Sequence, residues 1–498
     1  MAETKSLLKD SAIYGGSTII VRLISWLTTP LFTYTSMSKS GFGMITNIYA
    51  FAALITIILT FSMETGLFRF LNQNDKYKQN TVYSTVIIIV SSIVLLFAGF
   101  FFCFFDQVRG LWSDQIPNNF IRLAVLITCL DGFIAIPFAY LRYRKRPLKF
   151  GFIKLLQVVL YVLLCVFFLV VCPWINKHNP DLIAWFWRED FSVGYVLIAN
   201  LIATGIQTLF LLPYLTGFHY AFDWKLAKRL LRYCFPLVIM GFAGISNQVL
   251  DKLIFPIIYP DGGAAFDELG AYGGCFKITV IMMMFTQAFR YAFDPFIFEK
   301  SKDKDAKQSY AIATKYFIIL GLLVFLGVMF YLDIFKYFVP PSYFTALPII
   351  PIILVGELFF AVYYNLSIWY KLTDKTYWGI IFSLIGFVVI ITVNIVFIPT
   401  YGYMACAWAA FAGNGIIMLL SYFIGQKYYP VRYDLKTIFI YVGLAALLYC
   451  LAKFASIENR YLRLGFHTLL IGLYLAFLIK RDLPLKEIPF INRMKIFR

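Results

Sequence analysis

The sequence predicts an all-α integral membrane protein with about fourteen transmembrane helices. Of its 498 residues, 61% are hydrophobic and only 14% are charged, whereas soluble domains are about 45–50% apolar and about 25% charged. Apolar runs of about 20 residues, the length that crosses roughly 30 Å of hydrocarbon, recur along the whole chain. Basic residues gather in alternate connections between these runs, as they do in multi-pass membrane proteins.

Each apolar run is expected to form one membrane-spanning helix. The expected spans lie near 11–34, 43–67, 81–105, 120–141, 150–172, 191–215, 233–258, 270–298, 310–334, 346–370, 376–398, 402–425, 436–454 and 462–480. The N-terminal segment MAETKSLLKD has no apolar core or cleavage site of a signal peptide. We therefore expect the first span to be kept in the mature protein.

The distribution of basic residues predicts the orientation. With the N-terminus inside, about 29 of the 44 Lys and Arg fall in cytoplasmic segments and about 8 in outside loops. The densest cytoplasmic cluster runs from Arg142 to Lys149 and is interpreted as a topology anchor at anionic headgroups. We predict that both termini are cytoplasmic.

Several classes of function find no support in the sequence. The formal charge of +18 is explained by cytoplasmic loops, so no nucleic-acid partner is expected. No GxxxxGK[ST] motif for nucleotide binding is present, and the longest outside loop, near 173–190, leaves no room for a catalytic domain. The three histidines lack metal-ligand spacing, and nearly all eight cysteines lie in apolar runs. We expect neither an enzyme nor a cofactor.

A weak internal repeat suggests two halves. A span, a proline, a short outside loop and a glycine-opened span occur once from residue 7 to about 43 and again about 226 positions later. Two related six-helix bundles with the substrate site between them are a common transporter plan. We predict an N-terminal lobe of residues 1–218, a C-terminal lobe of 219–430, and two additional helices with a basic tail in 431–498.

The stretch from Arg232 to Lys300 organises the functional prediction. Two membrane-length segments here carry charged residues within or at the ends of their spans, namely Asp251, Lys252, Lys277, Arg290 and Asp294. A charge in hydrocarbon costs about 2.5–3.5 kcal/mol on insertion scales, so such residues usually face protein or water. We expect this pair of helices to form one wall of a polar cavity in the membrane.

Helical spacing groups further residues with these charges. Arg22 shares a face with Thr18, Ser25 and Thr29 in the first span. It is expected to face the cavity, where its guanidinium suits a phosphate; the alternative is a contact between helices. Asn247 and Asp251 share one face, as do Lys277 and Gln287. Lys277 can face substrate or protein equally well.

Other charged residues leave their roles open. Arg290 and Asp294 are four residues apart, which permits a structural salt bridge, a gate contact or ligand contact. Three acids lie within spans: Glu64, Asp131 and Glu357. Each acid can either neutralise a nearby cation or bind the proton or sodium ion of a coupled transporter.

The chain resembles the polysaccharide-export branch of the multidrug/oligosaccharidyl-lipid/polysaccharide flippase superfamily, the Wzx-type O-antigen flippases. The resemblance rests on KDSAIYGGSTIIVRLISWLTTPLFTYTSMSKSGFGMITNIYAF, YLRYRKRPLKF, FPLVIMGFAGISNQVLDKLI and LGAYGGCFKI. It implies a MATE-like fold of two six-helix lobes plus two helices. Related flippases tend to place a basic residue at the position of Arg22. Their Asp-Arg pair is Asp251-Lys252 here, which keeps both charges but loses bidentate phosphate geometry.

The implied activity is movement of undecaprenyl-diphosphate-linked oligosaccharide across the bacterial inner membrane by alternating access. It would serve O-antigen, lipopolysaccharide or other surface polysaccharide synthesis, with membrane lipids and the polysaccharide polymerase machinery as further partners. The alternatives are a cation-coupled multidrug antiporter of the same superfold, a membrane polymerase or glycosyltransferase, and a structural membrane protein. The antiporter predicts an acid-dominated cavity, and the polymerase predicts a long outside loop with catalytic residues.

Overall fold

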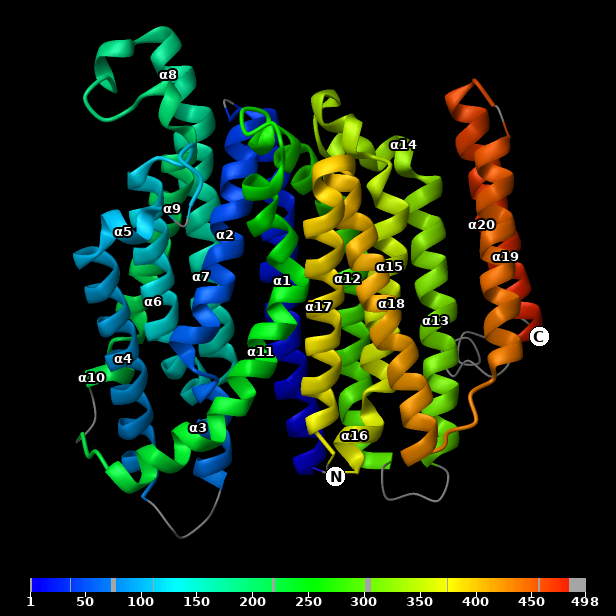
Figure 1. The fold of residues 1–498 in the computed structure, drawn as a ribbon, viewed down its shortest axis with the longest axis horizontal. Helices are drawn as coiled ribbons and strands as arrows, with labels where there is room; N and C mark the ends of the chain where they lie inside the picture. The colour runs from blue at the N-terminus through cyan, green and yellow to red at the C-terminus, as the bar shows by residue number, and fades with distance from the viewer. Residues whose placement is uncertain are drawn as a thin grey trace.

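Apolar runs of this length fold as helices because a helix satisfies its own backbone hydrogen bonds inside hydrocarbon. The computed structural model describes residues 2–35, 37–72, 78–110, 112–216, 220–300, 306–373, 375–455 and 457–482, with side chains except at 2–14, 291–292 and 294–300. These residues form an all-helical bundle without strands (Figure 1). The predicted basic tail beyond residue 482 lies outside the described residues.

The first half of the bundle contains six membrane-length segments and several short helices. Its elements are α1 (Ala2–Tyr34), α2 (Lys39–Thr60), α3 (Met63–Asn72), α4 (Gln79–Cys103), α5 (Phe105–Arg109), α6 (Asn118–Tyr143), α7 (Pro147–Val166), the π-helix η1 (Phe167–Val171), α8 (Cys172–His178), the 3₁₀ turns η2 (Pro180–Leu182) and η3 (Glu189–Phe191), α9 (Ser192–Leu211) and α10 (Pro213–Thr216).

The second half has eight long helices. Its elements are α11 (Trp224–Ile258), α12 (Ala265–Lys300), α13 (Ala306–Phe330), α14 (Leu332–Phe335), the 3₁₀ turns η4 (Lys336–Phe338) and η5 (Pro341–Ala346), α15 (Ile349–Leu366), α16 (Ile368–Leu372), α17 (Tyr377–Tyr401), α18 (Tyr403–Tyr428), α19 (Leu435–Phe454) and α20 (Arg460–Arg481).

The predicted spans are confirmed for all but the first. Among the described residues, thirteen helical segments are long and apolar enough to cross a membrane. The remaining long helix is α1, which has 33 residues and stands among the others in Figure 1. Its central part carries Arg22 and several hydroxyl residues, which lower the hydropathy of this helix.

Two helices differ from the simple spans that the sequence predicts. The expected span at 43–67 is broken into α2 and α3 where Phe61 and Ser62 adopt positive φ. The expected span at 233–258 begins nine residues earlier, at Trp224. The long α11 contacts α3 and α4 as well as α2 and α17. Figure 1 shows α11 crossing diagonally between the two halves of the bundle.

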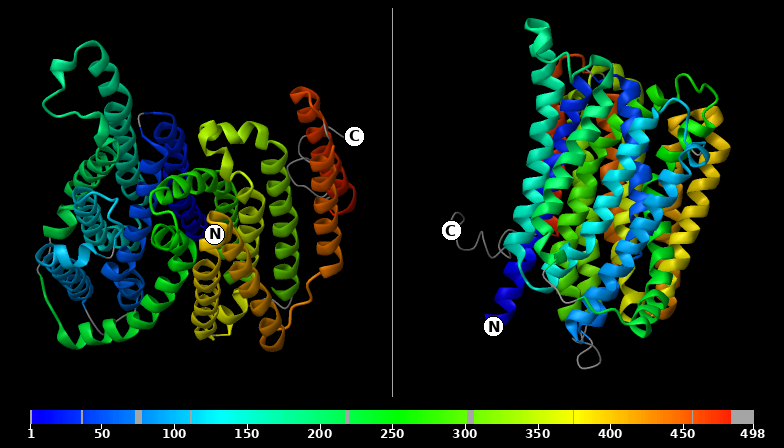
Figure 2. Two further views of the ribbon diagram at one scale, coloured as in Figure 1. Left: turned by 45° about the horizontal axis from the view of Figure 1, so that its top comes forward. Right: turned by 90° about the vertical axis from the view of Figure 1, so that its left-hand side faces the viewer.

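The bundle has two distinct ends, which we name the α14 end and the N-terminal end (top and bottom of Figure 1). The segment from α7 to α8 rises beyond its neighbours at the α14 end in Figures 1 and 2. The helices α19 and α20 stand at one edge and pack on α13. The halves meet mainly where α2 packs against α12 and α11.

The contact between α2 and α12 is unusually close because both helices carry glycine. A Cβ atom built on Gly43 would lie 2.1 Å from the Phe266 carbonyl oxygen, and one on Gly270 would lie 2.1 Å from that of Lys39. Any side chain at either position would force the helices apart. We call this contact, near the α14 end, the glycine seal.

Candidate functional site

A cavity of about 440 Å³ lies between the two halves, beneath the glycine seal. The first half contributes α1, α2, α7 and α9 to its wall, and the second contributes α11 and α12. Its lining residues are Ser25, Thr28, Thr29, Phe32, Phe42, Ile45, Thr46, Tyr49, Ala50, Gln157, Val158, Tyr161, Asn200, Val249, Lys252, Gly273, Phe276 and Lys277. We call it the central cavity.

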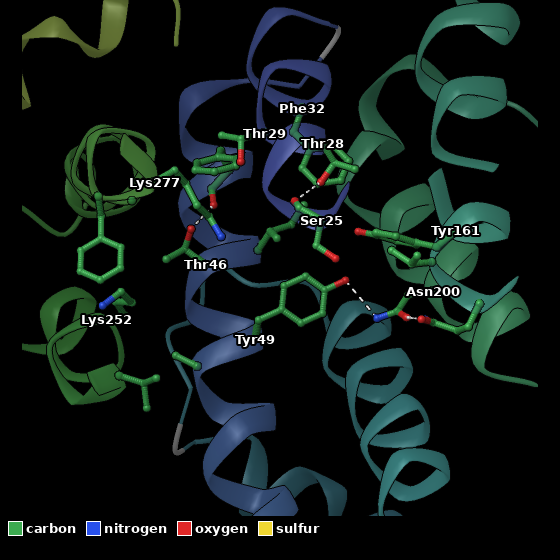
Figure 3. A pocket seen from close by; sticks show the side chains of 18 residues that line it. Ser25, Thr28, Thr29, Phe32, Thr46, Tyr49, Tyr161, Asn200, Lys252 and Lys277 are labelled. Carbon is green, nitrogen blue, oxygen red and sulfur yellow. Dashed lines mark hydrogen bonds between the residues drawn. The ribbon is translucent and has the colours of Figure 1, made fainter. Parts of the chain in front are cut away.

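The wall from the first half is polar but uncharged. Figure 3 shows Tyr49, Tyr161 and Asn200 gathered on one side, with Ser25 and Thr29 of α1 above them. The amide of Asn200 donates to the Tyr49 hydroxyl at 3.1 Å, and Gln157 donates to Asn200 at 3.5 Å. This network fixes hydroxyl and amide groups that can hydrogen-bond a polar ligand.

The wall from the second half supplies two cations. Lys277 is partly buried, and its ammonium forms no hydrogen bond or ion pair with any residue that the structure describes. Trp26 instead donates to the backbone oxygen of Lys277 at 2.6 Å, and so fixes that turn of α12 against α1. The second cation is Lys252, only 8% exposed. None of the lining residues is acidic, so the cavity favours anions.

Lys252 also lines a second, smaller cavity of about 20 Å³ in the second half. Its Nζ lies 3.1 Å and 3.0 Å from the two carboxylate oxygens of Asp251. The Tyr272 hydroxyl donates to the same carboxylate. Phe276 packs under the ammonium, 4.2 Å from Nζ to the ring centre. We call this hollow the acid cavity because Asp251 and Glu357 both line it.

Several predicted site residues come together at the N-terminal side of the central cavity. Arg22 donates to the side-chain oxygen of Gln287 at 2.5 Å and so joins α1 to α12. Arg290 lies one turn further along α12 and places its guanidinium 3.6 Å from the centre of the Tyr364 ring. These residues do not line the central cavity. The predicted partner of Arg290, Asp294, has a side chain outside the described residues.

The remaining predicted residues separate into different places. Glu64 forms an ion pair with Arg142, as expected of an acid that neutralises a nearby cation. Asp131 has no hydrogen bond or ion pair in the described chain and interacts electrostatically with Lys154 and Tyr49. Glu357 and Asn247 line the acid cavity rather than the central one. Whether any of these residues binds substrate or a coupling ion stays a prediction.

Sequence reasoning missed most of the uncharged polar wall. Gln157, Tyr161 and Asn200 lie in spans of the first half that the charge-based search did not single out. Gln157 and Asn200 are amides inside apolar runs, and that was a usable signal, because a buried amide needs a partner. Asn414 and Tyr272 of the acid cavity were missed for the same reason.

A third hollow has the opposite character. It is a groove of about 860 Å³ between α13, α15, α18 and α19, lined by aliphatic and aromatic side chains with a single threonine, Thr314, and the tyrosines Tyr422, Tyr433 and Tyr449. Within the described residues, no group of three or more His, Cys, Asp and Glu side chains is arranged to hold a metal ion.

Comparisons with known proteins place this geometry in a structural class. No family model matches the sequence. An uncharacterized membrane protein of Haemophilus influenzae is 22% identical over 313 residues, covering 61% of this chain and 68% of that protein. Among solved structures, the lipid II flippase MurJ in an inward closed conformation covers 94% of this chain and 98% of its own, with a TM-score of 0.71 and 14% identity.

Multidrug transporters show the same architecture. An inward-facing multidrug resistance MATE family transporter of the MOP superfamily covers 85% of this chain and 93% of its own, with a TM-score of 0.59 and 13% identity. A MOP superfamily transporter from Pyrococcus furiosus, described as having a binding pocket of reverse polarity, gives a TM-score of 0.57 at 12% identity, covering 84% and 95%. The chain is a multi-pass membrane protein with the fold that MurJ and the MATE transporters share.

Proposed function

We propose that the protein is a flippase that moves an undecaprenyl-diphosphate-linked oligosaccharide across a bacterial inner membrane by alternating access. The observation that carries this proposal is the unpaired ammonium of Lys277 in a hydroxyl-lined cavity within the membrane. A buried cation without a counter-ion is costly. That cost is offset when an anionic ligand occupies the cavity, together with Lys252.

The central cavity and the apolar groove together suit the three parts of such a substrate. The diphosphate would sit against Lys277 and Lys252, and sugar hydroxyls would hydrogen-bond to Tyr49, Asn200 and Ser25. Without such partners, each hydroxyl moved through hydrocarbon would cost several kcal/mol. The apolar groove beside α19 offers a surface compatible with a polyisoprenoid chain. Arg22 and Gln287 would meet the headgroup on its way to the cavity.

The orientation and lobe boundaries belong to the same proposal. With both termini cytoplasmic, the α14 end faces outward, and the glycine seal closes the central cavity on that side. The lobes are residues 1–218 and 219–430, with 431–498 as an addition. The product would feed surface polysaccharide or O-antigen assembly, in which the polymerase machinery is the natural partner.

A drug antiporter of the same fold is the second candidate, and the MATE structures favour it. An antiporter for cationic drugs needs an acidic binding cavity, because opposite charges attract. Here the central cavity is lined by two lysines and no carboxylate. This difference favours an anionic substrate.

Complementation of a bacterial strain that lacks its own O-antigen flippase tests the proposal. The wild-type chain should restore surface polysaccharide, and Arg22→Ala and Lys277→Met should each reduce it at least tenfold. Lys228→Met is the matched control because Lys228 is an exposed lysine on α11, away from the central cavity. Resistance to cationic drugs without restored polysaccharide would select the antiporter instead. Full activity of both test variants would remove the cationic site.

A further inference from the structure

One lysine of the second half lines both polar cavities. Lys252 belongs to the wall of the central cavity and to that of the acid cavity. Its ammonium is held by Asp251 and by the backbone oxygen of Gln248, 3.1 Å away. A lysine ammonium on its four-carbon stem can move between neighbouring partners by rotation. Lys252 therefore lies between the central cavity, which favours anions, and the fixed carboxylate of Asp251.

The acid cavity contains more polar groups than the ion pair needs. Glu357 lines it and makes no hydrogen bond with the described residues, although it interacts electrostatically with Lys252. Asn414, 6% exposed, lines the same cavity and has no hydrogen-bond partner in the described chain. The buried side-chain oxygen of Asn247 is also unpaired. A buried amide without a partner usually marks a place for a water or an ion.

The charged and titratable groups around this cavity come from four helices. Asp251 and Lys252 lie on α11, Tyr272 and the more distant Lys277 on α12, Glu357 on α15 and the Cys406 thiol on α18, whereas α17 contributes the apolar Ile390. With both carboxylates ionised and Lys252 in place, the group has one excess negative charge. Removing the ammonium would leave two buried carboxylates uncompensated, which is strongly unfavourable.

We propose that Lys252 exchanges Asp251 for the anionic group of the substrate, and that a proton then binds to the Asp251–Glu357 pair. This inference rests on the proposed function. The substrate anion gains the ammonium, the acid pair gains one proton from water, and no covalent bond is made or broken. Since linkage is reciprocal, a protonated acid pair favours anion binding by the same factor by which the anion favours protonation. One lysine thus couples the occupancy of the two cavities.

The test is proton uptake by the purified full-length chain when geranylgeranyl diphosphate is added in weakly buffered detergent solution. The titration of the probe alone is subtracted. We expect about one proton per bound probe, and a Kd that rises about tenfold per pH unit above the range in which the acid pair titrates. Lys277→Met is the matched control, because Lys277 lines only the central cavity. It should bind the probe more weakly but keep the same proton count.

The double variant Asp251→Asn/Glu357→Gln keeps Lys252 and removes the proton acceptors. It should bind the probe with no proton uptake and with a Kd independent of pH, and Lys252→Met should likewise show no uptake. Probe binding to the wild type without proton uptake, or unchanged uptake in the double variant, would overturn the exchange and leave the proposed function standing. Probe binding that occurs in sodium chloride but not in choline chloride would also overturn the exchange, because sodium would then take the place of the proton. Failure of the wild type to bind the probe would contradict both the proposed function and the Lys252 exchange.

Discussion

The two ends of the central cavity are held together by different kinds of contact. At the α14 end, the halves meet through glycine and backbone at Gly43 and Gly270. At the N-terminal end of the cavity, α1 and α12 meet through the long side chains of Arg22 and Gln287. Backbone packing of this kind exists only at one separation, whereas long polar side chains can follow a moving partner and rehydrate. The α14 end therefore behaves as a seal, and the N-terminal end as an adjustable contact.

The largest expected effect comes from breaking the glycine seal. In Gly43→Leu, the new side chain would collide with the carbonyl of Phe266, so the closed α14 end cannot form. We expect transport to fall at least tenfold. A cysteine at Thr46, in a chain whose native cysteines are replaced, should become reactive to an impermeant maleimide added on the α14 side.

Gly99→Leu is the control for this substitution. Gly99 faces outward on α4, and a Cβ there would meet no atom within 4 Å. It should leave both transport and labelling unchanged. Equal labelling of the Gly43→Leu chain and its parent would show that the glycine contact does not close the cavity.

A smaller effect is expected at Trp26, which supports the seal from α1. Its ring stacks on Phe338, with 4.3 Å between ring centres, and its Nε1 donates to the oxygen of Lys277. Trp26→Phe keeps the stacking and loses the hydrogen bond, which contributes about 1 kcal/mol. The ratio of closed to open molecules should drop about fivefold, measured by the same labelling of the cysteine at position 46. Trp26→Ala, which also loses the stacking, should increase labelling more than Trp26→Phe does. A larger increase in Trp26→Phe would show that Trp26 does not support the seal in this way.

At the N-terminal end, substitutions should act more weakly and in both directions. Gln287→Ala removes the acceptor of Arg22, but the exposed guanidinium can bind water instead, so transport should fall only about two- to fivefold. Gln287→Glu would form an ion pair with Arg22 and slow the opening of this end. Transport rates of both variants in vesicles test this, and a loss in Gln287→Ala as large as that in Gly43→Leu would contradict the comparison.

The smallest effect is expected from pH at the α14 end. Burial alone would raise the pKa of Asp333, but the hydrogen bond and charge of Lys336, together with Arg463, outweigh it and lower the pKa. The ion pair with Arg463, 2.6 Å long, ties the α14 segment to α20. Because a lowered carboxylate pKa stabilises the fold above the unfolded value, about 3.9, this support is lost only as pH falls below about 4. Labelling of the cysteine at position 46 can therefore differ between Asp333→Asn and its parent, but this difference should be the same at pH 5 and at pH 8.

The sequence was sufficient for the helices but not for how they face one another. Apolar length predicts each span because a helix must cross a fixed thickness. The break between α2 and α3 at Phe61 and Ser62 could not be predicted, since neither residue is glycine or proline. The early start of α11 was missed because residues 224–232 include four basic residues and do not form an apolar run.

The site was predicted in part for a related reason. Lys252, Lys277 and Gln287 were selected because charged and polar residues at membrane depth are rare, and the structure places the two lysines on the central cavity. That Asn247 and Glu357 belong to a separate hollow follows from helix rotation, which periodicity alone does not fix. Hydroxyl residues such as Thr46 carry little energetic signal in a sequence, because they can hydrogen-bond to their own helix, as Thr46 does to the Phe42 oxygen.

The glycine seal also has a consequence for how the two helices can vary. Lys39 of α2 faces Gly270 of α12, and Gly43 of α2 faces Phe266 of α12. Along the sequence, Phe266 follows Lys39 by 227 positions, and Gly270 follows Gly43 by the same number. Contacts that repeat in this reciprocal way are isologous, as in two copies of one surface related by a two-fold axis. The same patch is thus used once from each half. A residue larger than glycine is therefore excluded at position 270 for the same reason as at position 43: in each case the new side chain would collide with a backbone carbonyl of the other helix.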